Sequence, residues 1–318
     1  MRSLATTALL LTSLASALSV TGAEKAPVFT LTDPRGDDNG DGSLLYPRRD
    51  DYRPGVFDLL SLEAFAEKDG TTFVATFAEK VTPADRRVID RGGMTLDRIA
   101  RNGFYQFNID VYIDTDRKDG SGRRALLPGR GAEVVSAGGW EKAICLTPQP
   151  SETAQELKRI LRSFAKDEIR AEKGRVDDVD VARAKEEIDR DLAAKVFFPT
   201  RVRVAGPTIR FFVPESFLGG PAQASWGYLA AVSAADVEKK VDLGGLIGVT
   251  KDKPERLSIL PVGGGSWEDR LGTKRDEVDA PPPLVDIIVP AGMKQESLLA
   301  TPGRGETVKL PVVVPTDR

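Results

Sequence analysis

The sequence predicts a mainly β protein, a two-sheet antiparallel β-sandwich with an inserted α-helical hairpin. Two observations indicate this fold. Short alternating strand patterns separated by turn residues recur along most of the chain, whereas residues 151–195 are densely charged and carry apolar residues at helical spacing. Strands that bury one face need a second sheet to cover it. We therefore expect residues 24–318 to form a single β-sandwich domain, with 151–195 as a peripheral helical insertion.

Residues 1–23 are typical of a cleaved signal peptide. Arg2 precedes an apolar run over residues 4–20, and the small residues Thr21, Gly22 and Ala23, of the kind that export peptidases accept, follow it. Thr and Ser interrupt the run, which makes it less apolar than a membrane-spanning helix. We expect an exported protein, periplasmic or extracellular, with no membrane span after signal cleavage.

Composition excludes several classes of function. The 318 residues include 45 basic and 48 acidic side chains, so the charge balance gives no support to a nucleic-acid partner. Histidine is absent, which excludes Ser-His-Asp and Cys-His catalysis, HExxH zinc sites and His-ligated haem. Met94 and Met293 could ligate a haem iron but are equally well explained as apolar filler, so no haem is expected. Composition does not exclude a hydrolase that uses two carboxylates, since 48 acidic residues are available, but no spacing singles out a pair, and we expect no enzyme activity.

An acidic loop opens the predicted domain and resembles half of a calcium site. Asp37, Asn39, Asp41 and Gly42 form the run D-x-N-x-D-G, in which alternate oxygen side chains can converge on a hard cation. Arg48 stands where an EF-hand would place its bidentate Glu, so other groups must complete the coordination shell. The candidate ligands of a Ca²⁺ ion are Asp33, Asp37, Asp38, Asn39, Asp41 and Asp58.

Two alternatives explain the same loop without a metal. Asp and Asn side chains can bond the backbone of their own turn. The nearby Arg35, Arg48 and Arg49 can also pair with the carboxylates and offset their mutual repulsion.

The strand patterns follow in order. Residues 56–66 and 72–78 predict a β-hairpin that turns at 68–70. Residues 104–114 alternate strictly, with apolar residues at odd positions and Gln106, Asn108, Asp110 and Tyr112 between them, which predicts a strand whose second face is polar and exposed. Further strands are expected around 132–135, 140–146, 201–204, 209–213, 225–232 and 284–289.

A second acidic turn follows the alternating strand. Asp114, Asp116, Asp119 and Gly120 lie within the run DTDRKDGSG, which could bind an ion but more often forms a solvated loop.

The insertion predicts two helices that turn at Gly174. Leu157, Ile160, Leu161 and Phe164 give the first helix an apolar stripe, and Val181, Ile188 and Leu192 give the second a narrower one. The hairpin either packs these stripes within the fold or docks another protein.

The motifs DPRGDDNGDGSLLYP, GVFDLLSLEAF, VYIDTD, ALLPGRGAEV and VDIIVPAGMKQESLLA together resemble the glucodextranase C-terminal domain family. The resemblance spans nearly all of residues 28–316. It implies a β-sandwich related to DOMON domains and family 9 carbohydrate-binding modules, usually an appendage of secreted glycan-degrading enzymes, with no catalytic residues. The sequence departs from the family's pattern in two ways: the module is expected to stand alone, and it carries the helical insertion.

We therefore expect an exported, non-catalytic module whose ligand is a carbohydrate. Sugar recognition needs flat aromatic rings beside polar groups. The candidate rings, each of which could instead belong to the core, are Tyr112, Trp140, Trp226, Tyr228 and Trp267. The alternative is an interaction or assembly protein that docks an envelope protein through the helical insertion.

Overall fold

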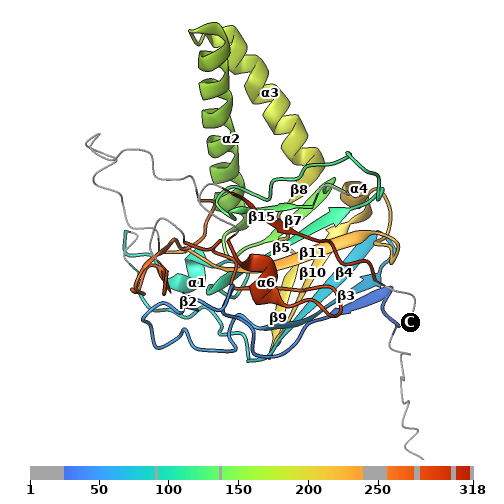
Figure 1. Ribbon diagram of the computed structural model, residues 1–318, viewed down its shortest axis with the longest axis vertical. Coiled ribbons are helices and arrows are strands. Elements are labelled where there is room, and N and C mark those ends of the chain that lie inside the picture. The colour runs from blue at the N-terminus through green and yellow to red at the C-terminus, as the bar shows by residue number, and fades with distance from the viewer. Residues whose placement is uncertain are drawn as a thin grey trace, which may run out of the picture.

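Two five-stranded sheets pack face to face in the computed structural model of the protein (Figure 1). The structure describes residues 25–89, 92–135, 138–238, 256–275, 280–301 and 306–315. The predicted signal peptide lies outside the described residues. The arrangement confirms the predicted antiparallel β-sandwich.

The first sheet has the order β1-β3-β4-β10-β9, and every neighbouring pair is antiparallel. Its strands are β1 (Phe29–Thr32), β3 (Leu59–Ala66), β4 (Gly70–Phe77), β9 (Val202–Ala205) and β10 (Thr208–Pro214). Strands β3 and β4 form the predicted hairpin. Its turn closes at Glu67, whose N–H donates to the Gly70 carbonyl at 2.8 Å.

The second sheet has the order β14-β11-β5-β7-β8, antiparallel except for the last pair. Its strands are β5 (Phe107–Asp114), β7 (Lys142–Leu146), β8 (Val196–Phe197), β11 (Gly227–Ala234) and β14 (Asp286–Ile287). Two small sheets join β2 (Leu44–Leu45) to β13 (Leu271–Thr273) and β12 (Val262–Gly264), and β6 (Ala132–Val134) to β15 (Val308–Leu310). The short helices are α1 (Leu96–Ile99), α4 (Glu215–Leu218) and α6 (Gln295–Leu299).

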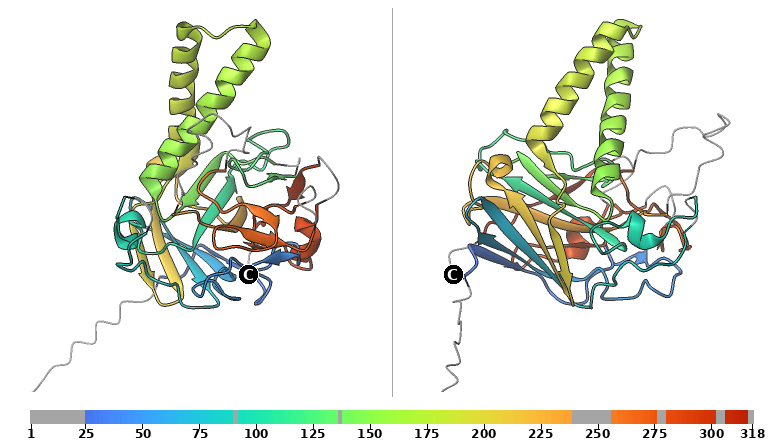
Figure 2. Two further views of the ribbon diagram at one scale, coloured as in Figure 1. Left: turned by 90° about the vertical axis from the view of Figure 1, so that its left-hand side faces the viewer. Right: turned by 180° about the vertical axis from the view of Figure 1, so that it is seen from behind.

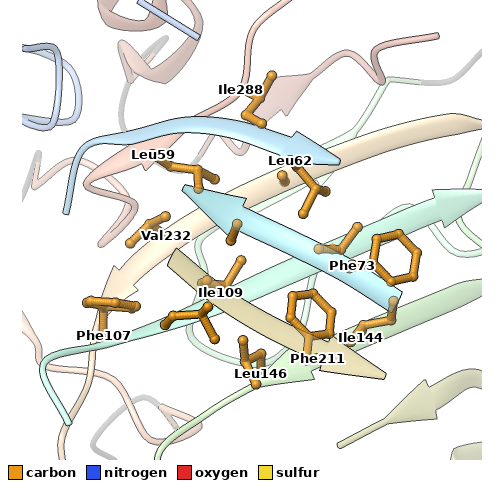
Figure 3. Close-up of a cluster of buried hydrophobic side chains, with 14 of the residues drawn as sticks. Leu59, Leu62, Phe73, Phe107, Ile109, Ile144, Leu146, Phe211, Val232 and Ile288 are labelled. Carbon is orange, nitrogen blue, oxygen red and sulfur yellow. The ribbon is translucent and has the colours of Figure 1, made fainter. Parts of the chain in front are cut away.

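The main hydrophobic core lies between the two large sheets. Alternate side chains of each strand point inward, and Figure 3 shows Phe73 and Phe211 of the first sheet near Ile109 and Ile144 of the second. The rings of Phe73 and Phe211 stack with centroids 5.5 Å apart. Each fully buried side chain of this size contributes about 1.5–3 kcal/mol, so these inward faces account for much of the sandwich's stability.

The outer face of β5 is also buried, which corrects the prediction that it is polar and exposed. Asn108, Asp110 and Tyr112 are each no more than 1% exposed. A second hydrophobic cluster covers them, contributed by segments far apart in sequence, including Leu127 and Leu284. The alternation of polar and apolar residues therefore predicted the strand and its two faces correctly, but it did not show that the polar face is also covered.

Most polar atoms of the side chains on this covered face have internal partners, although Asn108 Oδ1 is buried without one. Asp110 pairs with Arg130, whose Nε lies 2.7 Å from Oδ2, and both side chains are almost completely buried. Arg130 also donates to the Leu257 carbonyl at 2.5 Å, and Asn108 donates to the Ser258 carbonyl at 2.9 Å. Hydrogen bonds of this kind offset the cost of removing polar groups from water.

The predicted helical hairpin projects from one end of the sandwich (Figures 1 and 2). Helix α2 (Pro150–Lys173) ends at Gly174, which takes the left-handed conformation (φ 70°) of a C-cap. Helix α3 (Asp178–Lys195) begins with the Asp177 side chain accepting from the Asp180 N–H at 2.9 Å.

The base of the hairpin belongs to the core and its far end does not. Leu157, Ile160 and Leu192 are buried in the second hydrophobic cluster, on the outer side of the second sheet. Phe164 is 45% exposed and Val179 is 69% exposed. The insertion is thus anchored by the first turns of α2 and the last turn of α3, and it is peripheral beyond them. Among the described residues, no helix has the length and apolar character needed to cross a membrane.

Candidate functional site

The acidic loop between β1 and β3 is fastened to the C-terminal part of the chain by one side chain of α6. Gln295 Nε2 donates to the backbone carbonyl of Asp37 and, at 3.3 Å, to that of Gly40. Its Oε1 accepts from the Ile287 N–H at 2.7 Å. Because Gln295 is 1% exposed, this buried amide fixes the loop against β14.

Three carboxylates converge where the loop meets β14. Asp33, Asp37 and Asp286 each present one oxygen, and these oxygens lie within 4.8 Å of one another. Asp33 Oδ1 accepts from the Val289 N–H at 3.2 Å, and Asp286 Oδ2 accepts from the Leu59 N–H at 2.5 Å. These bonds orient the two carboxylates toward a shared point. We name Asp33, Asp37 and Asp286 the opening-loop centre.

Each of these residues keeps one buried oxygen without a hydrogen-bond partner: Asp33 Oδ2, Asp37 Oδ1 and Asp286 Oδ1. The nearby loop residues Asn39 and Asp58 also have buried Oδ1 atoms without partners. A buried polar atom left unpaired costs about 1–3 kcal/mol. Oxygen-rich shells of this kind suit Ca²⁺, which takes six to eight oxygen ligands from side chains, carbonyls and water.

The electrostatics of the centre favour a bound cation. Burial raises the pKa of Asp33 to about 8, and the negative charge of Asp37 adds to the effect. Burial likewise raises the pKa of Asp37 to about 6, and that of Asp286 lies well above its ordinary value. Because burial and, to a smaller extent, mutual repulsion disfavour their charged forms, the carboxylates retain protons unless a cation takes the protons' place.

Two predicted ligands lie outside the centre and hold the loop instead. Asp38 Oδ2 accepts from the Tyr46 hydroxyl and from the Gly55 N–H at 2.9 Å. Asp41 Oδ2 lies 2.8 Å from Arg275 Nη2, and its Oδ1 accepts from the Ser43 hydroxyl at 2.6 Å. Asp286 was not predicted as a ligand, because in the sequence it is a single acidic residue within an apolar predicted strand.

Arginine does not balance the opening-loop centre in the described part of the chain. Arg35 donates to the Ala78 carbonyl at 3.4 Å and Arg48 to the Ser266 hydroxyl at 3.3 Å, while Arg49 pairs with Asp51. Within the described residues, none of the three forms an ion pair with a carboxylate of the centre. The alternative that arginines pair with the loop carboxylates therefore applies to other parts of the loop and not to the opening-loop centre.

The far end of the loop is held by Asp51. Its carboxylate accepts from Arg49 Nε at 3.0 Å, from Arg87 Nη2 at 3.1 Å and from the Tyr105 hydroxyl at 2.6 Å. Burial opposes ionisation of this group, but the hydrogen bonds from Arg49 and Tyr105 outweigh it and lower the pKa to about 2.

The structure corrects most of the aromatic prediction. Tyr112, Trp140, Trp226 and Tyr228 are buried, at 7% exposure or less, so their rings have no face for a ligand. Two of these rings also form hydrogen bonds inside the protein: Trp140 Nε1 donates to the Ala125 carbonyl, and the Tyr228 hydroxyl donates to the Gln223 carbonyl. These rings fill the core.

Trp267 is the exposed one of the five candidate rings, at 57%. It lies between β12 and β13, beside a cleft of about 650 Å³. The guanidinium carbons of Arg48 and Arg270 are each 5.8 Å from the ring centroid. The cleft is lined by Arg256, Pro261, Val262, Gly263, Trp267, Asp269 and Arg270.

The acidic loop supports this cleft directly. Strand β2 of the loop pairs with β13, with Leu45 opposite Gly272, and the Arg48 N–H donates to the Trp267 carbonyl at 3.0 Å. The Asp41–Arg275 ion pair joins the same two segments. The opening-loop centre and the cleft are therefore built on one continuous piece of structure.

One protein-family model matches residues 28–313, a span that includes both large sheets, the acidic loop, the helical hairpin and the Trp267 cleft. Its description is the C-terminal, SLH-like binding module of glucodextranase. A comparison with curated proteins finds no match. The chain belongs to the family of SLH-like C-terminal binding modules of glucodextranase.

Proposed function

We propose that the protein is a non-catalytic carbohydrate-binding module whose sugar site is the cleft beside Trp267. The observation that carries this proposal is the position of Trp267, an exposed indole at the rim of a hollow that also contains charged side chains. Membership of a binding-module family of glucodextranase supports a glucan as the ligand class. The predicted signal peptide would place this activity in the periplasm or outside the cell.

The chemistry of the cleft suits a sugar. The flat indole can pack on the C–H face of a pyranose ring, and Arg256 and Asp269 offer donors and acceptors for hydroxyl groups. Arg48 and Arg270 border the ring, each with its guanidinium carbon 5.8 Å from the centroid, and add charged groups beside the exposed indole.

A divalent cation in the opening-loop centre would serve this site indirectly. Asp33, Asp37 and Asp286 have the donor type, the shared focus and the unpaired oxygens that Ca²⁺ requires. By joining the acidic loop to β14, the ion would fix the strand β2 that flanks Trp267. We therefore expect sugar affinity to fall when Ca²⁺ is removed.

The test is calorimetric titration with a panel of soluble glucans and other glycans. Trp267→Ala should weaken binding to the preferred glycan at least about tenfold, equivalent to about 1.4 kcal/mol, with an unchanged melting temperature. Phe164→Ala is the matched control, because it removes an exposed ring from helix α2, outside the lining of the cleft. Binding that survives Trp267→Ala undiminished, or no binding to any glycan, would refute the proposal.

A second candidate function is docking of an envelope protein through the hairpin. The specific observation is that the hairpin stands clear of the sandwich beyond its base and exposes Phe164 and Val179 there (Figure 2). Its mixed charges are partly paired within the hairpin, as in Arg162–Asp189 at 2.8 Å and Lys173–Asp180 at 2.6 Å.

Shortening the hairpin separates the two functions. A variant in which a flexible turn replaces residues 164–187 retains Leu157, Ile160 and Leu192, and should keep both its fold and its glycan affinity. A partner recovered from envelope extracts by the full chain and by the Trp267→Ala variant, but not by the shortened chain, would support docking. Equal recovery by all three would contradict it.

A further inference from the structure

A second group of carboxylates lies at the ends of two neighbouring strands of the second sheet. Asp114 is the last residue of β5, and Glu141 immediately precedes β7. The Glu141 N–H donates to the Ile113 carbonyl at 3.0 Å, which aligns the two strand ends. Asp114, Asp116 and Glu141 each present one oxygen, all within 4.8 Å of one another. We name these three residues the strand-end site.

Asp114 shows that this group is more than a solvated acidic turn. The residue is 1% exposed, and its Oδ2 is buried without a hydrogen-bond partner, while Oδ1 accepts from the Arg117 N–H at 2.7 Å. A carboxylate oxygen removed from water and left unpaired is costly, so it needs a partner of another kind.

The space beside this oxygen is kept open by a glycine. A Cβ atom added at Gly138 would lie 2.1 Å from Asp114 Oδ2, a contact that no side chain could make. The φ angle of Gly138 is not in the left-handed region, so backbone conformation does not require glycine there. Glycine at this position instead leaves room next to the unpaired oxygen.

The other two carboxylates are held in place by hydrogen bonds from the turn, Asp116 through one oxygen and Glu141 through both. Asp116 Oδ1 accepts from the Lys118 N–H at 3.0 Å and from the Ser121 hydroxyl at 2.8 Å. Glu141 Oε2 accepts from the Thr115 N–H at 2.9 Å. Glu141 Oε1 accepts only a long bond of 3.4 Å from the Ser121 hydroxyl, and each oxygen has a second lone pair that can bind another ligand. Within the described residues, no Lys or Arg side chain forms an ion pair with any of the three carboxylates of the strand-end site.

We propose that the strand-end site binds a divalent cation with a preference for oxygen ligands, Ca²⁺ being the best match, independently of the opening-loop centre. Three preoriented carboxylates supply the charge, and backbone carbonyls and water complete the six to eight ligands of such an ion. The bound ion would join the ends of β5 and β7. These ends lie near the base of α3, where Lys142 Nζ donates to the Ala194 carbonyl at 2.8 Å.

The structure also revises the membership of this site. The sequence grouped Asp119 with Asp114 and Asp116, whereas Glu141 is the third member in the folded chain. Asp119 is exposed and lies in the same turn. Asp119→Asn is therefore a matched control that removes one carboxylate charge without touching the proposed ligands.

The experiment counts bound Ca²⁺ per chain by equilibrium dialysis of the full chain. Asp116→Asn and Glu141→Gln should each bind one ion fewer than the wild type, and Asp119→Asn should bind the wild-type number. Gly138→Ala, which leaves the charge unchanged, should also lose one ion because its Cβ fills the space beside Asp114. Circular dichroism checks that each variant is folded.

The outcome does not depend on the opening-loop centre, because every variant is compared with the wild-type count. A wild-type count that survives in both Asp116→Asn and Glu141→Gln would overturn the proposal. So would loss of an ion from Asp119→Asn, which would show a general charge effect, or a wild-type chain that binds no Ca²⁺ at millimolar concentration.

Discussion

Removal of Ca²⁺ from the opening-loop centre should lower the melting temperature of the protein by several degrees. The perturbation is a chelator, or the substitution Asp37→Asn, which keeps the shape of the side chain and removes its charge. The reason is linkage: a cation held by Asp33, Asp37 and Asp286 can bind only the folded chain, since Asp286 is remote from the other two in sequence.

The magnitude follows from two general relations. Free Ca²⁺ at about 100 times its dissociation constant adds about 2.7 kcal/mol to the free energy of unfolding. A folded chain of about 290 residues has an unfolding entropy of about 0.6 kcal/mol/K near its melting temperature. The ratio gives a rise of about 4–5 °C on saturation with Ca²⁺.

The assay is differential scanning calorimetry of metal-free protein titrated with Ca²⁺. Asp37→Asn should reduce the Ca²⁺-induced rise relative to the wild type, and any rise that remains should come from the strand-end site. Asp50→Asn is the control: Asp50 is exposed in the same loop and outside the centre, so its response should equal that of the wild type. A melting temperature indifferent to chelator and to millimolar Ca²⁺, in protein shown to be metal-free at the start, would refute the reasoning.

The pH dependence of the melting temperature provides a second test of the opening-loop centre. Burial raises the pKa of Asp33 to about 8 and that of Asp37 to about 6 in the folded, metal-free chain. The folded state therefore holds protons that the unfolded chain releases near pH 4, and the stability they contribute is lost as pH rises through 6 and 8. In chelator the melting temperature should fall from pH 5 to pH 8, and Ca²⁺ should suppress that fall.

Three further predictions concern the rest of the fold, each measured by urea denaturation. Leu157→Ala should cost about 2–5 kcal/mol and Phe164→Ala less than about 0.5 kcal/mol, because only the first lies in the core; equal costs would contradict the division of the hairpin. Arg130→Met should cost about 3–5 kcal/mol by leaving Asp110 buried without its partner, and a neutral result would show that the pair is dispensable. Because hydrogen bonds outweigh burial and lower the pKa of Asp51 to about 2, its stabilisation is present above pH 4 and lost as pH falls toward 2. Asp51→Asn should remove that acid-sensitive contribution, about 1 kcal/mol after allowance for solvent screening, and an unchanged acid profile would argue against it.

The sequence predicted the elements whose formation depends on residues close together in the chain. The β3–β4 hairpin and both inserted helices follow from side-chain periodicity and turn residues, and the structure confirms them. The covering of β5 could not be predicted in the same way. Leu127, Leu257 and Leu284 come from three segments far apart in sequence, and local patterns do not show which segments pack together, so only the folded chain shows that they meet over Asp110 and Tyr112.

The candidate metal centre was predicted in part for a similar reason. The spacing of Asp33 and Asp37 in an Asp-rich and Gly-rich loop indicated a cation site, and the structure brings both to the opening-loop centre. Spacing could not show that Asp38 accepts hydrogen bonds from donors within the loop, or that Asp41 forms an ion pair with Arg275. Nor could it show that Asp286, far away in sequence, completes the group.

The long-range contacts of the opening-loop centre also set the order in which the protein can be assembled. The bond from the Val289 N–H to Asp33 spans 256 residues of sequence, and the bond from the Leu59 N–H to Asp286 spans 227. During synthesis the acidic loop emerges before β14, and 227 positions of sequence separate Leu59 at the end of the loop from Asp286. Until then the carboxylates of the loop lack their buried partner and repel one another. Closure of the centre is therefore a late event in folding, and a chain truncated before β14 cannot reach it.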